Sequence, residues 1–186
     1  CLLFKGAQGA GKSTIGERVM KEIIGDAKLF ITARTDKAFG KFSDLQGKLL
    51  CILNEASGKD THDIDNILKD CITANKIQLE KKNVDIVEVI DYCNFIFTTN
   101  GFNSVKLPKD DRRFIAIACS NRMKNNTDYF IPLYKAIQDK NIMRMFFQEL
   151  MERDLSKFHP SNDRPYTELT ETLKLVNAEY IDAFIN

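Results

Sequence analysis

The amino-acid sequence predicts an α/β fold with a central, mostly parallel β-sheet. A short apolar run at the start leads into a glycine-rich loop and then into a segment with helical spacing. Two further apolar runs end in polar residues at positions 54 and 100. Continuous apolar runs of this length are typical of strands buried on both faces, as in parallel sheets. A chain of 186 residues with 44% hydrophobic residues is long enough to bury such a sheet in one domain.

The first predicted element is a strand at residues 1–4, followed by a loop and a helix at 15–24. The loop fits the pattern G-x-x-x-x-G-K-S/T of a phosphate-binding loop at every fixed position. Glycines leave backbone N–H groups open to phosphate oxygens, Lys12 places a positive charge against the β- and γ-phosphates, and the Ser13 hydroxyl suits Mg²⁺. The motif predicts a nucleoside triphosphate ligand without separating kinases, GTPases and ATPase motors. The predicted binding residues are Gly6, Ala7, Gln8, Gly9, Ala10, Gly11, Lys12, Ser13 and Thr14.

The second apolar run, at residues 48–53, ends in Asn54 and Glu55. A buried parallel strand that ends in an acid is where enzymes with this loop hold Mg²⁺ and orient the attacking water. We predict Glu55 as the base or water-positioning residue, and Ser13, Asn54 and Glu55 as the residues near Mg²⁺. An amide at position 54 binds the ion more weakly than an aspartate would. The alternative is that Asn54 and Glu55 only cap the following segment.

A third strand is predicted at residues 94–99, and it ends in Asn100 and Gly101. A polar amide at the tip of this strand can reach the γ-phosphate and the lytic water, so Asn100 is predicted to sense the γ-phosphate. The alternative is a hairpin turn, for which the dipeptide Asn-Gly is favoured. The phosphate-binding loop and the strand that ends in Glu55 favour the sensing role.

Paired arginines, Arg112 and Arg113, follow two aspartates and precede a strand predicted at residues 114–119. In one interpretation they form a solvated basic patch. In the other they supply an arginine finger, a planar cation that stabilises charge on the transferring phosphoryl group. In ring ATPases such a finger acts on the ATP of the neighbouring subunit. The sequence does not decide between Arg112 and Arg113.

The segment between the second and third strands separates the function classes. Residues 63–72 have helical spacing, and residues 76–90 alternate apolar and polar side chains on either side of a basic turn. This alternation predicts a β-hairpin with a basic tip. In a ring translocase the hairpin projects lysines against DNA phosphates in the pore, whereas the alternative is a solvated surface hairpin. The predicted DNA contacts are Lys76, Lys81 and Lys82.

The C-terminal part shows no catalytic motif. Its amphipathic spacing predicts helices at residues 129–139, 142–154 and 169–185. Such a tail suits a lid or the start of a further domain. We therefore predict an ATPase core at residues 1–125 and a helical C-terminal segment at 126–186.

Charge and cysteine content exclude other classes. The 27 basic and 26 acidic residues give a net charge of +1, so nucleic-acid contact depends on the local placement of lysines. The five cysteines form no C-x-x-C pair, and neither histidine has a partner at metal-ligand spacing. This favours a reduced, intracellular protein over a disulfide or zinc framework. No apolar run approaches the length of a membrane span, and we expect no signal peptide because Lys5 and the glycine loop interrupt the first apolar run. We therefore expect no membrane partner. The start within a strand, without methionine, predicts a piece of a longer protein.

Five motifs follow one another in a fixed order: the loop GAQGAGKST, the strand ending in Asn54 and Glu55, the lysine-bearing hairpin, the strand FIFTTN, and the segment DRRF. Together they resemble the superfamily 3 helicases, closest to the helicase module of poxvirus-type and phage-type primase-helicases, over roughly residues 1–119. The resemblance implies an AAA+-like fold, hydrolysis of ATP with Mg²⁺, and DNA unwinding by a ring, typically a hexamer. It also implies single-stranded DNA as a partner and a fused or associated primase.

The resemblance assigns a role to each motif. Lys12 and Ser13 bind phosphate and Mg²⁺, Glu55 activates water, and Asn100 senses the γ-phosphate. Lys81 or Lys82 touches DNA, and one of the paired arginines acts in trans. Two alternatives stay open: a non-helicase AAA+ switch or loader, which leaves the hairpin idle, and a P-loop small-molecule kinase, which uses the loop alone. Stimulation of ATP hydrolysis by single-stranded DNA separates a helicase from a kinase.

Overall fold

The structure is a computed structural model that describes residues 1–39, 44–54, 76–81, 84–101, 107–159 and 162–185. Within these residues a five-stranded sheet has the order β2-β3-β6-β1-β7, and a separate two-stranded sheet is formed by β4 and β5. Every pairing in the five-stranded sheet is parallel. The predicted α/β fold with a central parallel sheet is therefore confirmed.

The strands are β1 (Leu2–Lys5), β2 (Leu29–Thr32), β3 (Leu50–Asn54), β4 (Lys76–Lys81), β5 (Val84–Ile90), β6 (Asn94–Thr99) and β7 (Ile115–Ala118). The helical elements are a π-helix (Thr14–Val19), α1 (Met20–Ile24), a 3₁₀ helix (Asp26–Lys28), α2 (Thr35–Phe39), α4 (Thr127–Gln138), α5 (Lys140–Met151) and α6 (Glu168–Ile185).

Both faces of the parallel sheet are buried. Alternate residues of β6 enter different apolar clusters, with Phe95 and Phe97 in one and Ile96 in the other. The same division separates Leu3 from Phe4 in β1, because successive side chains of a strand point to opposite faces. The continuous apolar runs in the sequence thus reflect burial on two sides.

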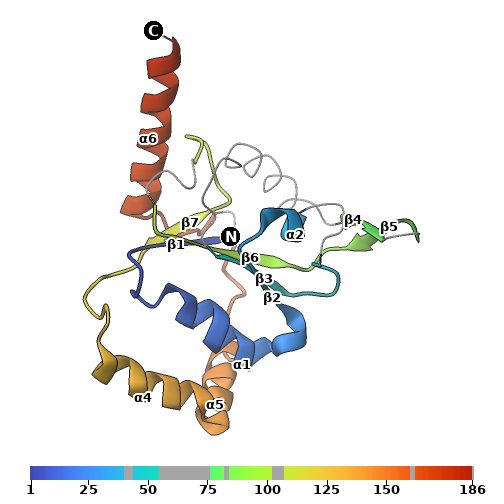
Figure 1. Cartoon of the computed structure of the whole chain (residues 1–186), viewed down its shortest axis with the longest axis vertical. Helices are drawn as coiled ribbons and strands as arrows, with labels where there is room; N and C mark the ends of the chain where they lie inside the picture. The colour runs from blue at the N-terminus through green and yellow to red at the C-terminus, as the bar shows by residue number, and fades with distance from the viewer. Residues whose placement is uncertain (40–43, 55–75, 82–83, 102–106, 160–161, 186) are drawn as a thin grey trace.

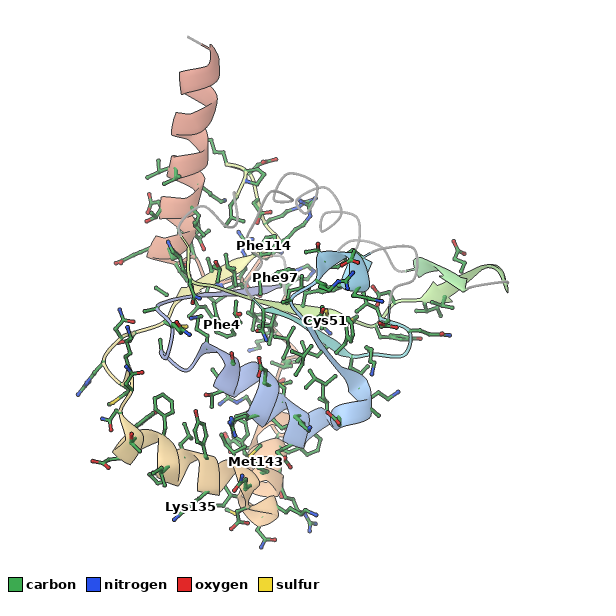
Figure 2. All side chains as sticks on the ribbon, in the orientation of Figure 1. Phe4, Cys51, Phe97, Phe114, Lys135 and Met143 are labelled. Atoms are coloured by element: carbon green, nitrogen blue, oxygen red, sulfur yellow. The ribbon has the colours of Figure 1, made fainter. Side chains whose placement is uncertain are left out.

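Helices cover the two faces unequally (Figure 1). The segment of α1, α4 and α5 lies on one side of the sheet, and α2 and α6 lie on the other. In Figure 2, Phe4 lies on the side that faces α1, whereas Phe97 and Phe114 lie on the opposite side. The rings of Phe97 and Phe114 pack with centroids 5.7 Å apart. The carboxyl ends of the central strands remain available for a site.

The predicted strands and tail helices agree with the structure, apart from small shifts in their ends. The predicted helix at 15–24 is present as the π-helix followed by α1. The sequence analysis missed β2 and α2, which are short and supply few buried side chains. The helix expected at 63–72 lies outside the described residues.

The C-terminal helix packs on the core of the sheet. Leu173 of α6 is buried in the same cluster as Phe97, and the hydroxyl of Thr167 donates to the carbonyl oxygen of Ala116 in β7 at 2.5 Å. The division of the chain at residue 125 stays a prediction. Among the helices that the structure describes, none is long and apolar enough to cross a membrane.

Candidate functional site

The glycine-rich loop connects β1 to the π-helix, and its path depends on glycine. Gly9 and Gly11 have φ of 80° and 85°, a region that other residues rarely adopt. Gly6 needs its missing side chain for another reason, since a Cβ there would lie 2.8 Å from the Cβ of Cys119. The amide of Thr14 donates to the carbonyl oxygen of Gly11 at 3.0 Å and starts the helical turn. The loop backbone therefore follows a path that side chains at Gly6, Gly9 and Gly11 would not allow.

Lys12 is held at the centre of the loop by three oxygen atoms. Its Nζ donates to the carbonyl oxygens of Gly6 and Ala7, each at 2.8 Å, and to Oδ1 of Asn100 at 2.6 Å. Asn100 reaches this place because β6 pairs directly with β1, with Thr99 level with Lys5. The structure thus brings together two residues that were predicted from motifs 88 positions apart.

Asn54 at the tip of β3 connects two neighbouring elements. Its Nδ2 donates to Oε1 of Glu17 at 2.5 Å, and its Oδ1 accepts from the hydroxyl of Thr98 at 3.0 Å. The sequence analysis missed Glu17 and Thr98. The available signal for Glu17 was its spacing, because a residue four positions after Ser13 lies on the same helix face as Ser13.

One side of α4, from Thr127 to Tyr134, forms the opposite wall of the site. The rings of Phe130 and Tyr134 stack with centroids 5.7 Å apart, and the guanidinium of Arg18 lies 4.3 Å from the centroid of Tyr134. Phe130 packs so closely on the loop that a Cβ at Gly11 would lie 3.1 Å from its ring. Asn126 starts this helix by accepting a hydrogen bond from the amide of Tyr129. The C-terminal segment, which was expected to carry no chemistry, therefore contributes to the site.

These elements enclose a pocket of about 770 Å³. Its size is within the range of small-molecule sites. The lining residues are Gln8, Gly9, Gly11, Lys12, Ser13, Thr14, Glu17, Arg18, Asn54, Thr98, Asn100, Asn125, Asn126, Thr127, Phe130, Ile131 and Tyr134. Most of the predicted loop residues, together with Asn54 and Asn100, thus share one pocket.

Two buried or half-buried groups at the ends of the central strands have altered proton affinities. Burial lowers the pKa of Lys5, the last residue of β1. Burial raises the pKa of the Cys119 thiol, and the positive charge of Lys12 acts in the opposite direction. Neither group has a role in the sequence-based predictions, but both are consistent with a partly desolvated edge of the sheet.

The paired arginines lie in the turn before β7 and differ in their surroundings. Arg113 is half-buried, with Nη1 at 3.9 Å from Oδ2 of the buried Asp111, whereas Arg112 is exposed. Asp111 also accepts from the amides of Arg113 and Phe114, at 3.0 and 3.1 Å. Arg164 of the C-terminal segment lies 3.9 Å from the same carboxylate. Neither Arg112 nor Arg113 lines the pocket of its own chain.

The remaining predicted residues lie elsewhere or outside the described part. Lys76 begins β4 and Lys81 ends it, in an antiparallel pair with β5 that projects from one end of the sheet (Figure 1). Glu55 and Lys82 lie outside the described residues. The predicted hairpin strands are therefore present, while the role of the lysines stays a prediction.

The pocket residues fit a divalent cation that accompanies a nucleotide. The Ser13 hydroxyl, the Asn54 amide and the Glu17 carboxylate all line the pocket and carry hard oxygen atoms, which Mg²⁺ prefers. Among the described residues there is no group of three His, Cys, Asp or Glu that could hold a metal alone. A site of this type therefore depends on the phosphates of the nucleotide for its other ligands.

The sequence of the chain matches one protein-family model. Residues 4–113, more than half of its length, match the model of DUF5906, described as a family of unknown function. The chain belongs to the DUF5906 family. The matched region extends from β1 through the paired arginines, so it includes four of the five motifs in full and all of the segment DRRF except Phe114.

A relative and two solved structures extend this relationship. The DNA primase-polymerase of Nitratiruptor phage NrS-1 is 32% identical over 139 residues, which are 73% of this chain and 19% of that protein. The apo structure of the NrS-1 C-terminal region (305–718) has a TM-score of 0.77 and 27% identity, over 95% of this chain and 42% of that chain. The chain thus spans less than half of the length of the phage primase-polymerase and less than half of the solved C-terminal region.

A more distant neighbour shares the fold. A JCV helicase structure matches with a TM-score of 0.51 and 14% identity, over 100% of this chain and 52% of that chain. This DUF5906 chain is therefore related to a phage primase-polymerase and has the fold of a viral helicase. The resemblance to phage-type replication proteins, inferred from five ordered motifs, is confirmed.

Proposed function

We propose that this DUF5906 chain is the ATP-hydrolysing module of a replication protein, a DNA helicase of superfamily 3 type that moves along single-stranded DNA during viral or phage replication. The observation that carries the proposal is the contact between Lys12 and Asn100, whose Nζ and Oδ1 atoms are 2.6 Å apart. Lys12 is suited to bind the β- and γ-phosphates, and the Asn100 amide is suited to the γ-phosphate. Because the two side chains touch, both can contact the same triphosphate.

The relatives support the type of function. One is a phage protein named as a DNA primase-polymerase, and the structural neighbour of the same fold is named as a helicase. A replication role for this chain is consistent with both names. A small-molecule kinase would use the loop but has no need for the projecting β4–β5 pair, and a switch or loader would also leave that pair idle.

The residues predicted from the five motifs have distinct roles in the proposed hydrolysis. Backbone N–H groups of the loop and Lys12 bind the triphosphate, and Asn100 orients the γ-phosphate. Glu55 accepts the proton of the attacking water, and an arginine of the neighbouring subunit stabilises charge on the transferring group. The Ser13 hydroxyl would help to hold Mg²⁺, which would neutralise charge on the phosphates. The remaining chemistry is positioning, which the parallel sheet supplies by aligning the strand tips.

The test of the proposed function is ATP hydrolysis with and without single-stranded DNA. A helicase is expected to hydrolyse ATP faster when the DNA is present, and to unwind a forked duplex. Hydrolysis that is indifferent to DNA, together with transfer of phosphate to a small acceptor, would support the kinase instead. Stimulation by DNA without unwinding would support the switch or loader.

The role proposed for Glu55 gives a prediction of its own. Glu55→Gln is expected to retain ATP binding and to lower turnover about 100-fold, because a glutamine cannot take the proton of the attacking water. ATP affinity by calorimetry and phosphate release measured on the same sample separate the two effects. Normal phosphate release by this variant would remove Glu55 from its role.

The basic hairpin gives a second prediction. Lys81→Ala combined with Lys82→Ala is expected to leave basal ATP hydrolysis unchanged and to weaken single-stranded DNA binding. The slope of log affinity against log salt should fall by about 0.7 for each DNA phosphate that the variant no longer neutralises. DNA-stimulated hydrolysis and unwinding should fall together. The measurement is a titration of labelled single-stranded DNA at several salt concentrations.

A matched control for the hairpin removes the same charge elsewhere. Lys135 and Lys157 are exposed on the side of α4 and on the loop after α5. Replacing both by alanine lowers the net charge equally and should change the salt slope much less. Unwinding at the normal rate by the hairpin variant would show that its lysines belong to a solvated turn.

A further inference from the structure

We propose that Glu17 supplies a protein carboxylate that holds the divalent cation of the nucleotide site, beside the amide of Asn54 at the tip of β3. This inference rests on the proposed nucleotide-binding function. It assigns a metal-site role to a residue of the helix after the loop. The tip of β3 contributes an amide, Asn54, at the position where this chemistry ordinarily uses a carboxylate.

The fold places Glu17 beside the predicted cation ligand Ser13. The two residues are four positions apart, so they lie on one face of the helical segment, and both line the pocket. Gly16 allows this segment to approach the sheet closely, because a Cβ there would lie 2.7 Å from Cδ1 of Ile52 in β3. The segment is a π-helix from Thr14 to Val19, a form that is frequent at functional sites. Glu17 therefore reaches the tip of β3.

The two hydrogen bonds of Asn54 fix the orientation of its side-chain amide between Glu17 and Thr98. An ionised carboxylate only accepts hydrogen bonds, so Asn54 turns its NH₂ group toward Glu17, with Nδ2 at 2.5 Å from Oε1. The amide oxygen is turned to Thr98, which donates to it at 3.0 Å. Asn54 thus presents a donor to Glu17 and orients its carboxylate. A carboxylate has about four acceptor sites, and this hydrogen bond uses one of them.

The charges in the pocket also favour Glu17. Among the described residues that line it, Glu17 is the single acid, and Lys12 and Arg18 are cations. Mg²⁺ is bound in such sites through one or two carboxylates plus substrate phosphates. An amide is a weaker partner for the ion because it carries no net charge. If Glu55 serves as the base, Glu17 is the carboxylate that the described lining of the pocket offers to the cation.

The alternative role for Glu17 is structural, as the acceptor that orients Asn54. Glu17→Gln separates the two roles, because glutamine keeps an acceptor oxygen for the Asn54 amide and loses the charge. We expect this variant to bind ATP normally in EDTA. In the presence of ADP it should bind Mn²⁺ roughly 10- to 100-fold more weakly than the wild type, as measured by electron paramagnetic resonance. Glu22→Gln is the matched control, because Glu22 is exposed on the following helix α1 and lies outside the pocket.

A charge exchange across the hydrogen bond provides the decisive comparison. In the double variant Glu17→Gln/Asn54→Asp, the carboxylate moves to the tip of β3 and the amide moves to the helix. If the cation requires one carboxylate at this place, the double variant should recover most of the Mn²⁺ affinity that the single variant loses.

The outcomes separate this inference from the function on which it rests. A Mn²⁺ affinity within twofold of the wild type for Glu17→Gln, with ATP still bound, would overturn the role of Glu17 and leave the nucleotide site intact. Weaker ATP binding in EDTA, without a specific effect on Mn²⁺, would also overturn it and assign Glu17 to the structural role. A wild-type chain that binds neither ATP nor ADP would contradict both proposals.

Discussion

Lys12→Ala is expected to raise the dissociation constant for ATP roughly 100-fold and to abolish hydrolysis at ordinary nucleotide concentrations. A hydrogen bond to a charged group contributes about 1.5–3 kcal/mol, and the ammonium group is suited to two phosphates at once. In this structure its Nζ makes three hydrogen bonds with oxygens of the loop and Asn100. The variant therefore lacks both the cation proposed to bind phosphate and the hydrogen bond between the loop and Asn100. Calorimetric titration with ATP and Mg²⁺ measures the effect.

Folding must be separated from binding in this experiment. Thermal unfolding without nucleotide reports whether removal of the three hydrogen bonds destabilises the loop itself. Lys21→Ala is a suitable control, because Lys21 is exposed on α1. Its Nζ pairs with Oδ1 of Asp26 at 3.0 Å. An ATP affinity for Lys12→Ala close to that of Lys21→Ala would contradict a phosphate-binding role for the loop.

Strands with long apolar runs were predictable from the sequence, whereas the edge strand β2 was not. All four residues from Leu50 to Leu53 of β3 are buried, so the run is continuously apolar and easily recognised. In β2, Leu29 is buried but Ile31 is 40% exposed, because β2 is at the edge of the sheet. The four residues of β2, LFIT, give neither a long apolar run nor a clear alternation. Its existence depends on pairing with β3, which local sequence does not report.

The residues of the candidate site also fall into a predicted group and a missed group. Lys12, Asn54 and Asn100 were predictable because each occupies a fixed place in a motif or at a strand tip. Glu17 was missed because its position depends on the contact between Gly16 and Ile52, two segments far apart in sequence. The aromatic wall of α4 was missed for a similar reason. Its amphipathic pattern predicts a helix, but only the packing against the loop shows which side faces the pocket.

Arg112→Ala is expected to lower ATP hydrolysis by roughly a thousandfold and to leave ATP binding nearly intact, the effect of a missing arginine finger. The surroundings of the two arginines favour Arg112, which is exposed, whereas Arg113 faces the buried carboxylate of Asp111 at 3.9 Å. An arginine that completes a neighbour's site has to extend from its own surface. Arg113→Ala should instead lower the free energy of unfolding by about 1 kcal/mol, because it removes a partner of Asp111.

Mixing two inactive variants tests whether the arginine acts across an interface. Lys12→Ala subunits have an intact Arg112, and Arg112→Ala subunits have an intact nucleotide site. If the chain forms a ring, a mixed assembly contains interfaces where a complete nucleotide site meets a complete finger, and part of the hydrolysis should return. Phosphate release as a function of the mixing ratio measures this recovery, and native mass spectrometry with nucleotide shows whether mixed assemblies form. Mixed assemblies without recovered activity, or normal hydrolysis by Arg112→Ala alone, would show that Arg112 does not complete a neighbouring site, and the proposed ring would lose its main chemical support.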